Sequence, residues 1–469
     1  MMAGTPQYLR NLNENLIMDA LINQGAMSRA DISRQTGLSK PTVSSAVEHL
    51  IERNLVKETG RADNAQGRKA TLIQFNETAY YVCGVDIGAT RIRVALADLN
   101  GQIVAYAAYP PIIQDMHQQQ ESNESQESKE SQQSIDSQQS NESSERSVLL
   151  LLHGYVNQML QKNGLEWSNI RCIGFGIPGV VLPGSGKIKR IVEPLTGMES
   201  AFSRDALARA FPCDVILDND VNMAALGEYR SGAAVDSPLF VFFSIGAGTG
   251  AGIMVQGQLL HGLGGMTGEV AEMLLENGSR LEDVLSAYGL LHLAKQQGVA
   301  LGLKTSNELK NSNELKESNE IKKSNEVKNP KHSDALPFSA EEVTGDNTDD
   351  NIDAAADGLQ ALTPEMIFEA ARSGEALAIS VIKQYSRMIA QALRQISTVL
   401  APELIVLGGG IGGNGDMLLP ILRQIAAEQF PVKPQLICSA LGERAVVTGA
   451  VQVALQRTLL NLQQGVSEE

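Results

Sequence analysis

Apolar and polar positions divide the chain of 469 residues into three blocks with different patterns. Residues 8–75 show apolar positions at helical spacing, followed by short stretches typical of a hairpin. Residues 80–230 begin with apolar runs around the turn signals Gly88-Ala89 and Asn100-Gly101, which predict consecutive strands. In residues 238–460, apolar runs such as LFVFFSI and ELIVLGG alternate with long amphipathic segments. Alternating strands and helices predict an α/β fold.

Two polar stretches interrupt these blocks. Residues 114–147 consist almost entirely of Gln, Ser, Glu and Asn, and residues 304–358 contain four copies of a unit that begins Ser-Asn-Glu. Such segments bury too little apolar surface to offset chain entropy, so both are predicted to be disordered insertions. The predicted domains are residues 1–76, residues 80–230 with the first insertion, and residues 231–462 with the second.

The first block carries the signals of a helix-turn-helix. Ser28 is predicted to cap a short helix over residues 29–36, Gly37 to make the turn, and Ser39 to cap a second helix. Val43 and Val47 recur at helical spacing and are expected to face a core. The polar residues between them are expected to face the major groove of DNA. These predicted DNA-binding residues are Ser39, Lys40, Thr42, Ser44 and Ser45.

A basic loop follows between two predicted strands and is typical of a wing. Its Arg61, Arg68 and Lys69 are expected to reach phosphates or the minor groove. Residues 1–75 contain nine Lys or Arg and seven Asp or Glu, a balance of +2, whereas the whole chain has a formal charge of −16. This asymmetry favours a small DNA-binding module at one end. A protein-binding helical module with a solvated basic loop remains the alternative.

Three glycine-rich turns are candidates for binding phosphates, because glycine lets backbone amides approach a ligand closely. In the first, Asp86 is a candidate for holding magnesium-bound water. The candidate nucleotide-binding residues are Asp86, Gly88 and Thr90 in the first turn, Gly246, Gly248, Thr249 and Gly250 in the second, and Gly408, Gly409 and Gly410 in the third.

The motifs DIGAT, GIPG, LDNDVNMAALGE, GAGTGAGI with HGLGGMTGEV, and VLGGG together resemble the ROK family of repressors, open reading frames and kinases. With the winged helix in front, the chain is similar to the xylose-repressor and N-acetylglucosamine-repressor branch of that family. The resemblance covers nearly the whole chain apart from the two insertions and the C-terminal tail. It implies a winged helix-turn-helix followed by a two-lobed domain of the actin/hexokinase-like (ribonuclease H-like) kind.

The resemblance also implies a sugar site. Asp220 matches the catalytic base of ROK kinases and Asn219 a sugar-binding amide, while Glu269 and Glu282 match glutamates that contact sugar hydroxyls. Gly179, which ends the GIPG motif, is included among the sugar-binding residues. The alternatives are that Asp220 only caps the helix from Val221 and that Glu269 is a solvated loop acid.

One family feature is missing. ROK proteins usually carry a zinc-binding histidine and a cysteine-rich loop, but Glu272 stands at the histidine position and no cysteine lies between Cys213 and Cys438. We therefore expect no zinc, and no residue is assigned as a metal ligand. The four cysteines are predicted to be reduced core residues, and the chain shows neither a signal peptide nor an apolar run of membrane-spanning length, so a cytoplasmic protein is expected.

These observations predict a sugar-responsive DNA-binding regulator. We expect a repressor that binds operator DNA as a homodimer and takes a monosaccharide or a derivative as its effector. The first alternative is an ATP-dependent sugar kinase that uses Mg-ATP, since the turns and Asp220 are retained. The second alternative is a scaffold controlled by a protein partner.

Overall fold

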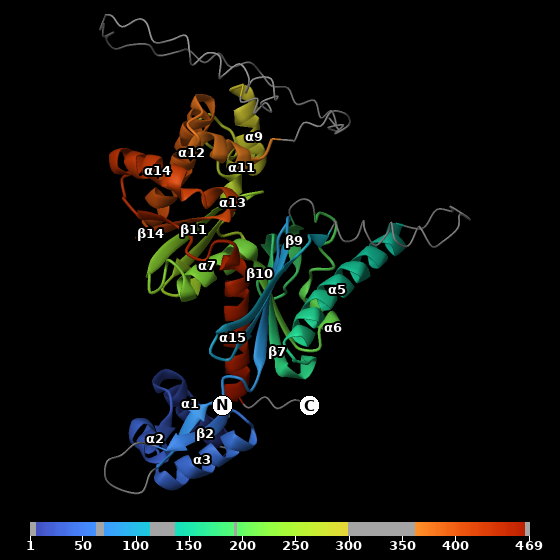
Figure 1. Cartoon of the computed structure of the whole chain (residues 1–469), viewed down its shortest axis with the longest axis vertical. Coiled ribbons are helices and arrows are strands. Elements are labelled where there is room, and N and C mark those ends of the chain that lie inside the picture. Colours follow the sequence, from blue (N-terminus) through green and yellow to red (C-terminus); the bar gives the residue numbers. More distant parts are fainter. Residues whose placement is uncertain (1–5, 62–69, 113–136, 192–194, 299–361, 465–469) are drawn as a thin grey trace, which may run out of the picture.

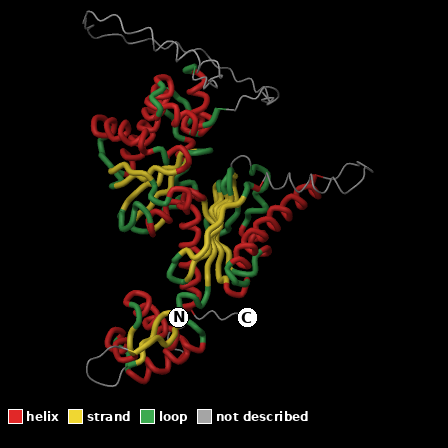
Figure 2. Tube along the Cα trace, viewed as in Figure 1, coloured by secondary structure: helices red, strands yellow, loops and turns green. Residues whose placement is uncertain are grey.

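The computed structural model describes residues 6–61, 70–112, 137–191, 195–298 and 362–464. Figure 1 shows the winged helix at one end, a first lobe in the middle and a second lobe beyond it. Each lobe has a five-stranded sheet with helices on its faces, as Figure 2 shows by secondary structure. No described helix is both long and apolar enough to span a membrane.

The N-terminal domain is a winged helix. It contains α1 (Pro6–Gln24), α2 (Arg29–Thr36), α3 (Lys40–Glu52) and a sheet of β1 (Met27–Ser28), β3 (Thr71–Phe75) and β2 (Val56–Arg61). The Ser28 hydroxyl accepts from the Asp31 amide at 3.2 Å, and Ser39 accepts from the Thr42 amide at 3.3 Å. Gly37 ends α2 with a φ of 72°, a value that favours glycine. The predicted helix-turn-helix is confirmed.

The first lobe has the strand order β10-β7-β4-β5-β6. Its strands are β4 (Tyr81–Ile87), β5 (Ile92–Asp98), β6 (Ile103–Tyr109), β7 (Ile170–Ile177) and β10 (Asp214–Asn219). The parallel strands β4, β7 and β10 are in register, so that Asp86 and Asp218 both lie beside Gly176. The carboxyl ends of these strands therefore meet at one edge, where α/β sheets bind ligands. A small ribbon of β8 (Gly179–Val181) and β9 (Ile188–Ile191) follows β7.

Helices α5 (Ser137–Lys162) and α6 (Arg204–Ala210) belong to the first lobe. Helix α5 begins inside the stretch 114–147 that the sequence predicts to be disordered, so residues 137–147 are a correction to that prediction. Val148, Leu152 and Val156 are buried at helical spacing and anchor this helix. The preceding glutamine and glutamate residues have good helix propensity and extend it toward the N-terminus. The remainder of this insertion, and the whole of residues 304–358, lie outside the described residues.

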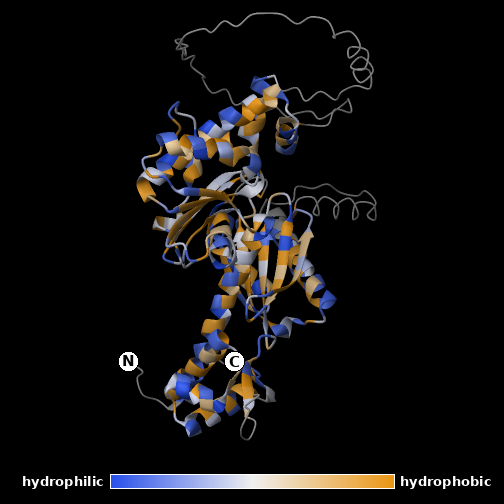
Figure 3. Cartoon of the chain, turned by 60° about the vertical axis from the view of Figure 1, so that its left-hand side comes forward, coloured by the Kyte–Doolittle hydropathy of each residue, from blue (hydrophilic) through white to orange (hydrophobic). Residues whose placement is uncertain are grey.

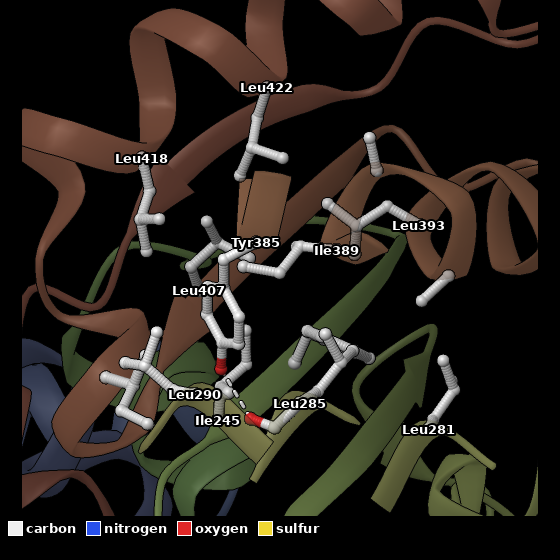
Figure 4. Close-up of a cluster of buried hydrophobic side chains, with 14 of the residues drawn as sticks. Ile245, Leu281, Leu285, Leu290, Tyr385, Ile389, Leu393, Leu407, Leu418 and Leu422 are labelled. Carbon is white, nitrogen blue, oxygen red and sulfur yellow. Dashed lines mark hydrogen bonds between the residues drawn. The ribbon is translucent and has the colours of Figure 1, made fainter. Parts of the chain in front are cut away.

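The second lobe has the strand order β13-β12-β11-β14-β15. Its strands are β11 (Leu239–Ile245), β12 (Thr249–Val255), β13 (Gln258–Leu259), β14 (Leu404–Gly408) and β15 (Gln435–Cys438). Its helices are η2 (Leu263–Gly265), η3 (Val270–Glu272), α8 (Leu281–Leu285), α9 (Ala287–Gln296), α11 (Pro364–Arg372), α12 (Ala376–Leu400), α13 (Gly409–Gly412), α14 (Gly415–Gln429) and η4 (Gly442–Arg444). In the core of this lobe, Tyr385 is fully buried and its hydroxyl donates to the Leu285 carbonyl (Figure 4).

Two helices each pack on the sheet of the other lobe. Helix α7 (Asp220–Ser231) follows the first sheet in sequence but packs on β11 and β12, whereas α15 (Ala445–Gln464) follows the second sheet and packs on β4 and β7. The two helices also pack against each other. A Cβ atom added to Gly449 would lie 1.7 Å from the Met223 carbonyl oxygen, so this close approach requires glycine.

The C-terminal half of α15 reaches the winged helix, as Figure 1 shows. Arg53 donates to the Leu462 carbonyl at 3.0 Å, Asn11 to the Gln464 carbonyl at 3.2 Å, and Gln463 to the Asp19 carboxylate at 3.0 Å. One hydrophobic cluster contains residues of α1 and α3, of β4 and β5, and of α15. Apolar positions on these elements appear in orange in Figure 3. The winged helix and the first lobe therefore share a core.

Candidate functional site at the junction of the lobes

Asp220 is the first residue of α7 and lies at the edge where the parallel strands of the first sheet end. Burial raises the pKa of its carboxyl to about 7, and the charges of Asp86 and Glu269 act in the same direction. Asp86 of β4 and Glu269 of the second lobe are thus both close enough to Asp220 to raise the pKa of its carboxyl. A carboxyl group with a pKa near 7 is suited to accept a proton from a hydroxyl.

Asn219, and not Asp220, is the N-cap of α7. Its side-chain oxygen accepts from the amides of Val221 at 2.8 Å and Asn222 at 3.1 Å, and its nitrogen donates to the Gly179 carbonyl at 3.0 Å. The predicted sugar-binding residues Asn219 and Gly179 therefore lie together, but the amide of Asn219 is used to fix the start of α7.

Asp218 and His261 form a contact between the lobes that the sequence did not predict. His261 Nε2 lies 2.6 Å from Asp218 Oδ2, and this hydrogen bond is the main cause that raises the pKa of His261 above its usual 6.5. Asp218 belongs to the first sheet, whereas His261 follows β13 of the second. The motif HGLGGMTGEV includes this histidine, but no spacing rule links it to Asp218.

Glu269 lies beside a cluster of opposite charges. Burial raises the pKa of Glu269, and the positive charge of Arg190 opposes that rise. Arg190 of β9 donates to Glu272 at 2.9 Å, and Arg280 donates to the same oxygen at 3.1 Å. Glu272, which stands at the family's zinc-histidine position, is therefore held by two arginines. Arg190 brings a residue of the first lobe to this cluster.

Glu282 supports the second glycine turn. Its carboxylate accepts from the Thr249 amide at 2.9 Å, and a Cβ atom on Gly248 would lie 3.1 Å from the other carboxylate oxygen. Burial raises the pKa of Glu282, and the Thr249 amide is the largest opposing influence. One carboxylate oxygen of Glu282, a predicted sugar-binding residue, is thus already bonded within the protein. The same is true of the Thr249 amide, which was predicted to bind phosphate.

Other donors of the glycine turns are also used within the protein. The Gly88 amide donates to the Arg91 carbonyl at 3.1 Å, and the Gly246 amide donates to the Gly248 carbonyl at 2.9 Å. Thr90 is exposed in the turn after β4. Gly250 lies in β12 against α7, and Gly408, Gly409 and Gly410 join β14 to α13, with Gly409 at a φ of +79°. A phosphate at the first two turns would have to break existing hydrogen bonds.

The surroundings of Asp86 do not favour the role of holding magnesium-bound water for which the sequence makes it a candidate. Arg93 Nη1 donates to Asp86 Oδ2 at 3.1 Å. Burial raises the pKa of Asp86 to about 6, and the charge of Arg93 opposes that rise. In the described parts of the chain, no group of three or more His, Cys, Asp or Glu side chains is arranged to hold a metal ion.

The predicted DNA-binding side chains lie on α3 and just before it. Lys40 and Ser45 are exposed, and Thr42 and Ser44 are partly exposed. Ser39 is occupied as the helix cap, and its hydroxyl shares a hydrogen bond of 2.7 Å with that of Thr42. Residues 62–69 lie outside the described residues, and these include the predicted wing residues Arg68 and Lys69. The side chain of Arg61 is likewise not described.

A surface cavity of about 690 Å³ lies between β12 and the C-terminal half of α12. Its lining is mostly apolar and includes Val270, Met273 and Val399. None of the predicted sugar-binding side chains lines it. The carboxylates at the lobe junction therefore define the candidate site, and the cavity does not.

Comparison with known proteins places this arrangement in a family. The ROK family profile matches residues 82–315 and 350–457, which together exceed half of the chain. The chain belongs to the ROK family. A MarR family profile matches residues 12–68, so this ROK protein carries a MarR-type helix-turn-helix at its N-terminus.

Relatives of this ROK protein include both regulators and kinases. It is 22% identical to the xylose repressor of Caldicellulosiruptor bescii, over 97% of this chain and 98% of that protein. It is 23% identical to the DNA-binding transcriptional dual regulator NagC of Escherichia coli, over 98% of this chain and 95% of that protein. A glucokinase of Halalkalibacterium halodurans is 28% identical over 75% of this chain and 87% of its own.

The predicted fold is confirmed by a solved structure. A ROK family transcriptional regulator, described as a homolog of the E. coli MLC protein, matches with a TM-score of 0.61 at 20% identity. The match covers 97% of this chain and 99% of the other. The winged helix and both lobes of the protein therefore follow the architecture of a known ROK regulator.

Proposed function

We propose that this ROK protein is a sugar-responsive transcriptional repressor that acts in the cytoplasm as a homodimer on operator DNA. The observation that carries this proposal is α15, which begins at the lobe junction and ends in hydrogen bonds with the winged helix. A ligand that changes how the lobes meet would thereby act on the DNA-binding domain through a packed element. The names of the xylose repressor and of NagC agree with this role.

The effector would be a monosaccharide or a derivative bound among the carboxylates of the junction. Asp220 and Glu269 keep acceptor capacity there, because no described side chain donates to either carboxylate; the Val221 amide donates to Asp220 Oδ1 at 2.9 Å. Carboxylate oxygens accept hydrogen bonds from vicinal hydroxyls. Asn219, Gly179 and Glu282 would shape the site mainly through the elements that they fix.

Release of DNA requires that the sugar prefers one arrangement of the lobes over the other, since equal affinity for both shifts no population. Two contacts join the lobes at the site, namely Asp218 with His261 and Arg190 with Glu272. A sugar that contacts Asp220 from the first lobe side and Glu269 from the second would favour the arrangement in which both contacts are formed.

A sugar kinase is the second candidate, and the pKa of Asp220 near 7 favours it because that value suits a catalytic base. Against it, Asp86 is paired with Arg93, and the amides of Gly88, Gly246 and Thr249 are bonded within the protein. Phosphoryl transfer depends on positioning and on charge stabilisation, for which these groups would be needed. The geometry therefore supports a sensor better than a kinase.

Thermal unfolding against a panel of monosaccharides, each with and without Mg-ATP, tests the proposal. A sugar at about one hundred times its dissociation constant should stabilise the protein by about 2.7 kcal/mol, and ATP should add nothing. Glu269→Gln should remove most of this shift, whereas Glu365→Gln, a matched change at an exposed residue of α11, should preserve it.

Two results would contradict the sensor. A shift that requires ATP and decays as ADP forms would make Asp220 a catalytic base and the protein a kinase. No shift with any sugar of the panel, or with the corresponding phosphosugars measured in the same way, would favour the third interpretation, in which a protein partner controls the molecule.

A further inference from the structure

Asp86 and Arg93 face each other across the first hairpin of the ROK domain. The two residues are direct cross-strand partners in the antiparallel pair β4–β5. Their ion pair is largely removed from solvent, with side-chain exposures of 5% for Asp86 and 13% for Arg93. A guanidinium group in this position keeps its positive charge at every pH at which the protein is folded.

The same guanidinium has a second acidic partner. Arg93 Nη2 donates to Glu443 Oε2 at 3.1 Å, although the two residues are 350 positions apart in the sequence. Glu443 lies in η4, the turn that leads directly into α15. Arg93 therefore connects the first glycine turn of the first lobe with the start of the helix that reaches the winged helix.

The segment before η4 is also fixed by a buried acid. Glu228 of α7 is fully buried, and its carboxylate accepts from the Ser439 hydroxyl, from the Ala440 amide at 3.3 Å and from the Leu441 amide at 3.0 Å. Glu228 and Arg93 thus both bond to the segment that leads into α15, Arg93 through the Glu443 side chain, which is 72% exposed.

A divalent cation at Asp86 would meet strong opposition. It would have to displace Arg93 from the carboxylate or bind beside a fixed positive charge in a poorly solvated position.

We infer that Arg93 is a built-in cation that takes the place of a divalent metal at Asp86 and, through Glu443, joins the first glycine turn to the start of α15. Arg93 is a positioning residue in this inference. The regulatory meaning of this inference rests on the proposed function and deepens it. The first glycine turn, which would bind nucleotide in a kinase, would here fix the start of α15, the helix proposed to couple sugar binding to the winged helix. The cation replacement itself requires neither sugar nor DNA.

A titration with Mn²⁺ tests the cation replacement. Binding is measured as the decrease in the electron paramagnetic resonance signal of free Mn²⁺. The titration is done at about pH 8, where Asp86 is ionised. The wild-type chain should show no Mn²⁺ site that depends on Asp86. Arg93→Gln should gain an Asp86-dependent Mn²⁺ site and bind Mn²⁺ at least about ten-fold more tightly than Arg91→Gln, because one positive charge beside a buried carboxylate is removed. Adding Asp86→Asn to that variant should abolish the gain.

Two matched controls accompany this titration. Arg91→Gln removes the same charge from an exposed side chain of the same turn and should behave like the wild type. Arg93→Lys keeps a cation near Asp86 and should not gain the Mn²⁺ site. This variant also tests the inference if Arg93→Gln folds poorly. The inference is overturned if wild-type protein binds Mn²⁺ in a way that Asp86→Asn removes, or if Arg93→Gln binds no more tightly than Arg91→Gln.

Hydrogen exchange tests the link to α15 without any ligand. Glu443→Gln should increase exchange in the peptide that covers residues 439–449, whereas Glu365→Gln should not, because only the former weakens the contact with Arg93. Equal exchange in both variants would overturn the link. Neither Mn²⁺ binding nor hydrogen exchange depends on a sugar. If no sugar of the panel bound, both measurements would still test this inference, so it and the proposed function can be disproved separately.

Discussion

His261 is the residue whose charge state is most directly tied to the junction between the lobes. Its ring nitrogen lies 2.6 Å from Asp218, and its side chain is 36% exposed. The hydrogen bond raises the pKa of His261, which means that the protonated ring is more stable in the folded protein than in the unfolded chain. The junction is therefore sensitive to pH near neutrality.

We expect His261→Asn to cost more stability at low pH than at high pH. Because the folded pKa is raised above 6.5, the stabilisation is fully present below that value and is lost as the pH rises through the folded pKa. The difference in unfolding midpoint between wild type and variant should be larger at about pH 6 than at about pH 8.5. His292→Asn, the same change at an exposed histidine of α9, is the matched control for the substitution itself. A difference independent of pH would disprove the charged contact.

Residue chemistry could be predicted from the sequence where the partner is close along the chain. Ser28 and Ser39 were predicted as helix caps because a cap and its amide lie three residues apart, and both are confirmed. Arg93 with Glu443, and His261 with Asp218, could not be predicted in this way. Their partners are 350 and 43 positions away, and only the packing of the lobes brings them together.

At the scale of elements, the packing of α7 on α15 depends on absent side chains. An added Cβ would lie 1.7 Å from a carbonyl oxygen at Gly449, and 2.3 Å from the Ala445 carbonyl oxygen at Gly227. Gly174 of β7 similarly lets the backbone of α15 approach the first sheet, since its Cβ would lie 2.1 Å from the Ala450 carbonyl oxygen. Backbone atoms cannot move aside as flexible side chains can.

Gly449→Ala should therefore destabilise the protein by at least about 1–3 kcal/mol, the usual cost of overpacking a core. Gly154→Ala provides the matched control, because Gly154 lies in α5 with nothing within 4 Å of an added Cβ. That change should be neutral or stabilise by up to about 1 kcal/mol through helix propensity. Urea unfolding of both variants measures the two free energies. Similar values for the two would show that the helices can separate without loss.

Strands and helices were largely predictable as elements, but their partners were not. The dipeptide Asn100-Gly101 predicted the hairpin of β5 and β6, and Gly101 has the expected positive φ of 79°. Helix α7 packs on the second sheet and α15 on the first, although each follows the other sheet in the chain. The sequence of a helix with an apolar face does not reveal which of the two sheets that face will contact. The first turns of α5 were predicted to be disordered, since they have the composition of a disordered segment.

At the scale of the whole molecule, the winged helix and the first lobe share one hydrophobic cluster, and this determines whether the winged helix unfolds alone or together with the lobe. Buried residues of the winged helix, such as Ile17 and Leu50, belong to the same cluster as Val82 of β4 and Val451 of α15. A domain joined by a loose linker would unfold independently of its neighbour. A domain that shares its core should lose protection together with that neighbour.

We accordingly expect α3 and β4 to become exchange-competent at the same denaturant concentration. Leu455→Ala, which shortens a buried α15 side chain of this cluster, should lower the protection of both elements together, at a cost of about 2–5 kcal/mol. Val104→Ala, at a half-exposed position of β6, is the control and should change neither. The measurement is native-state hydrogen exchange of the full chain. If α3 lost protection while β4 kept it, the winged helix would be an independent unit, and α15 could not transmit a signal through a common core.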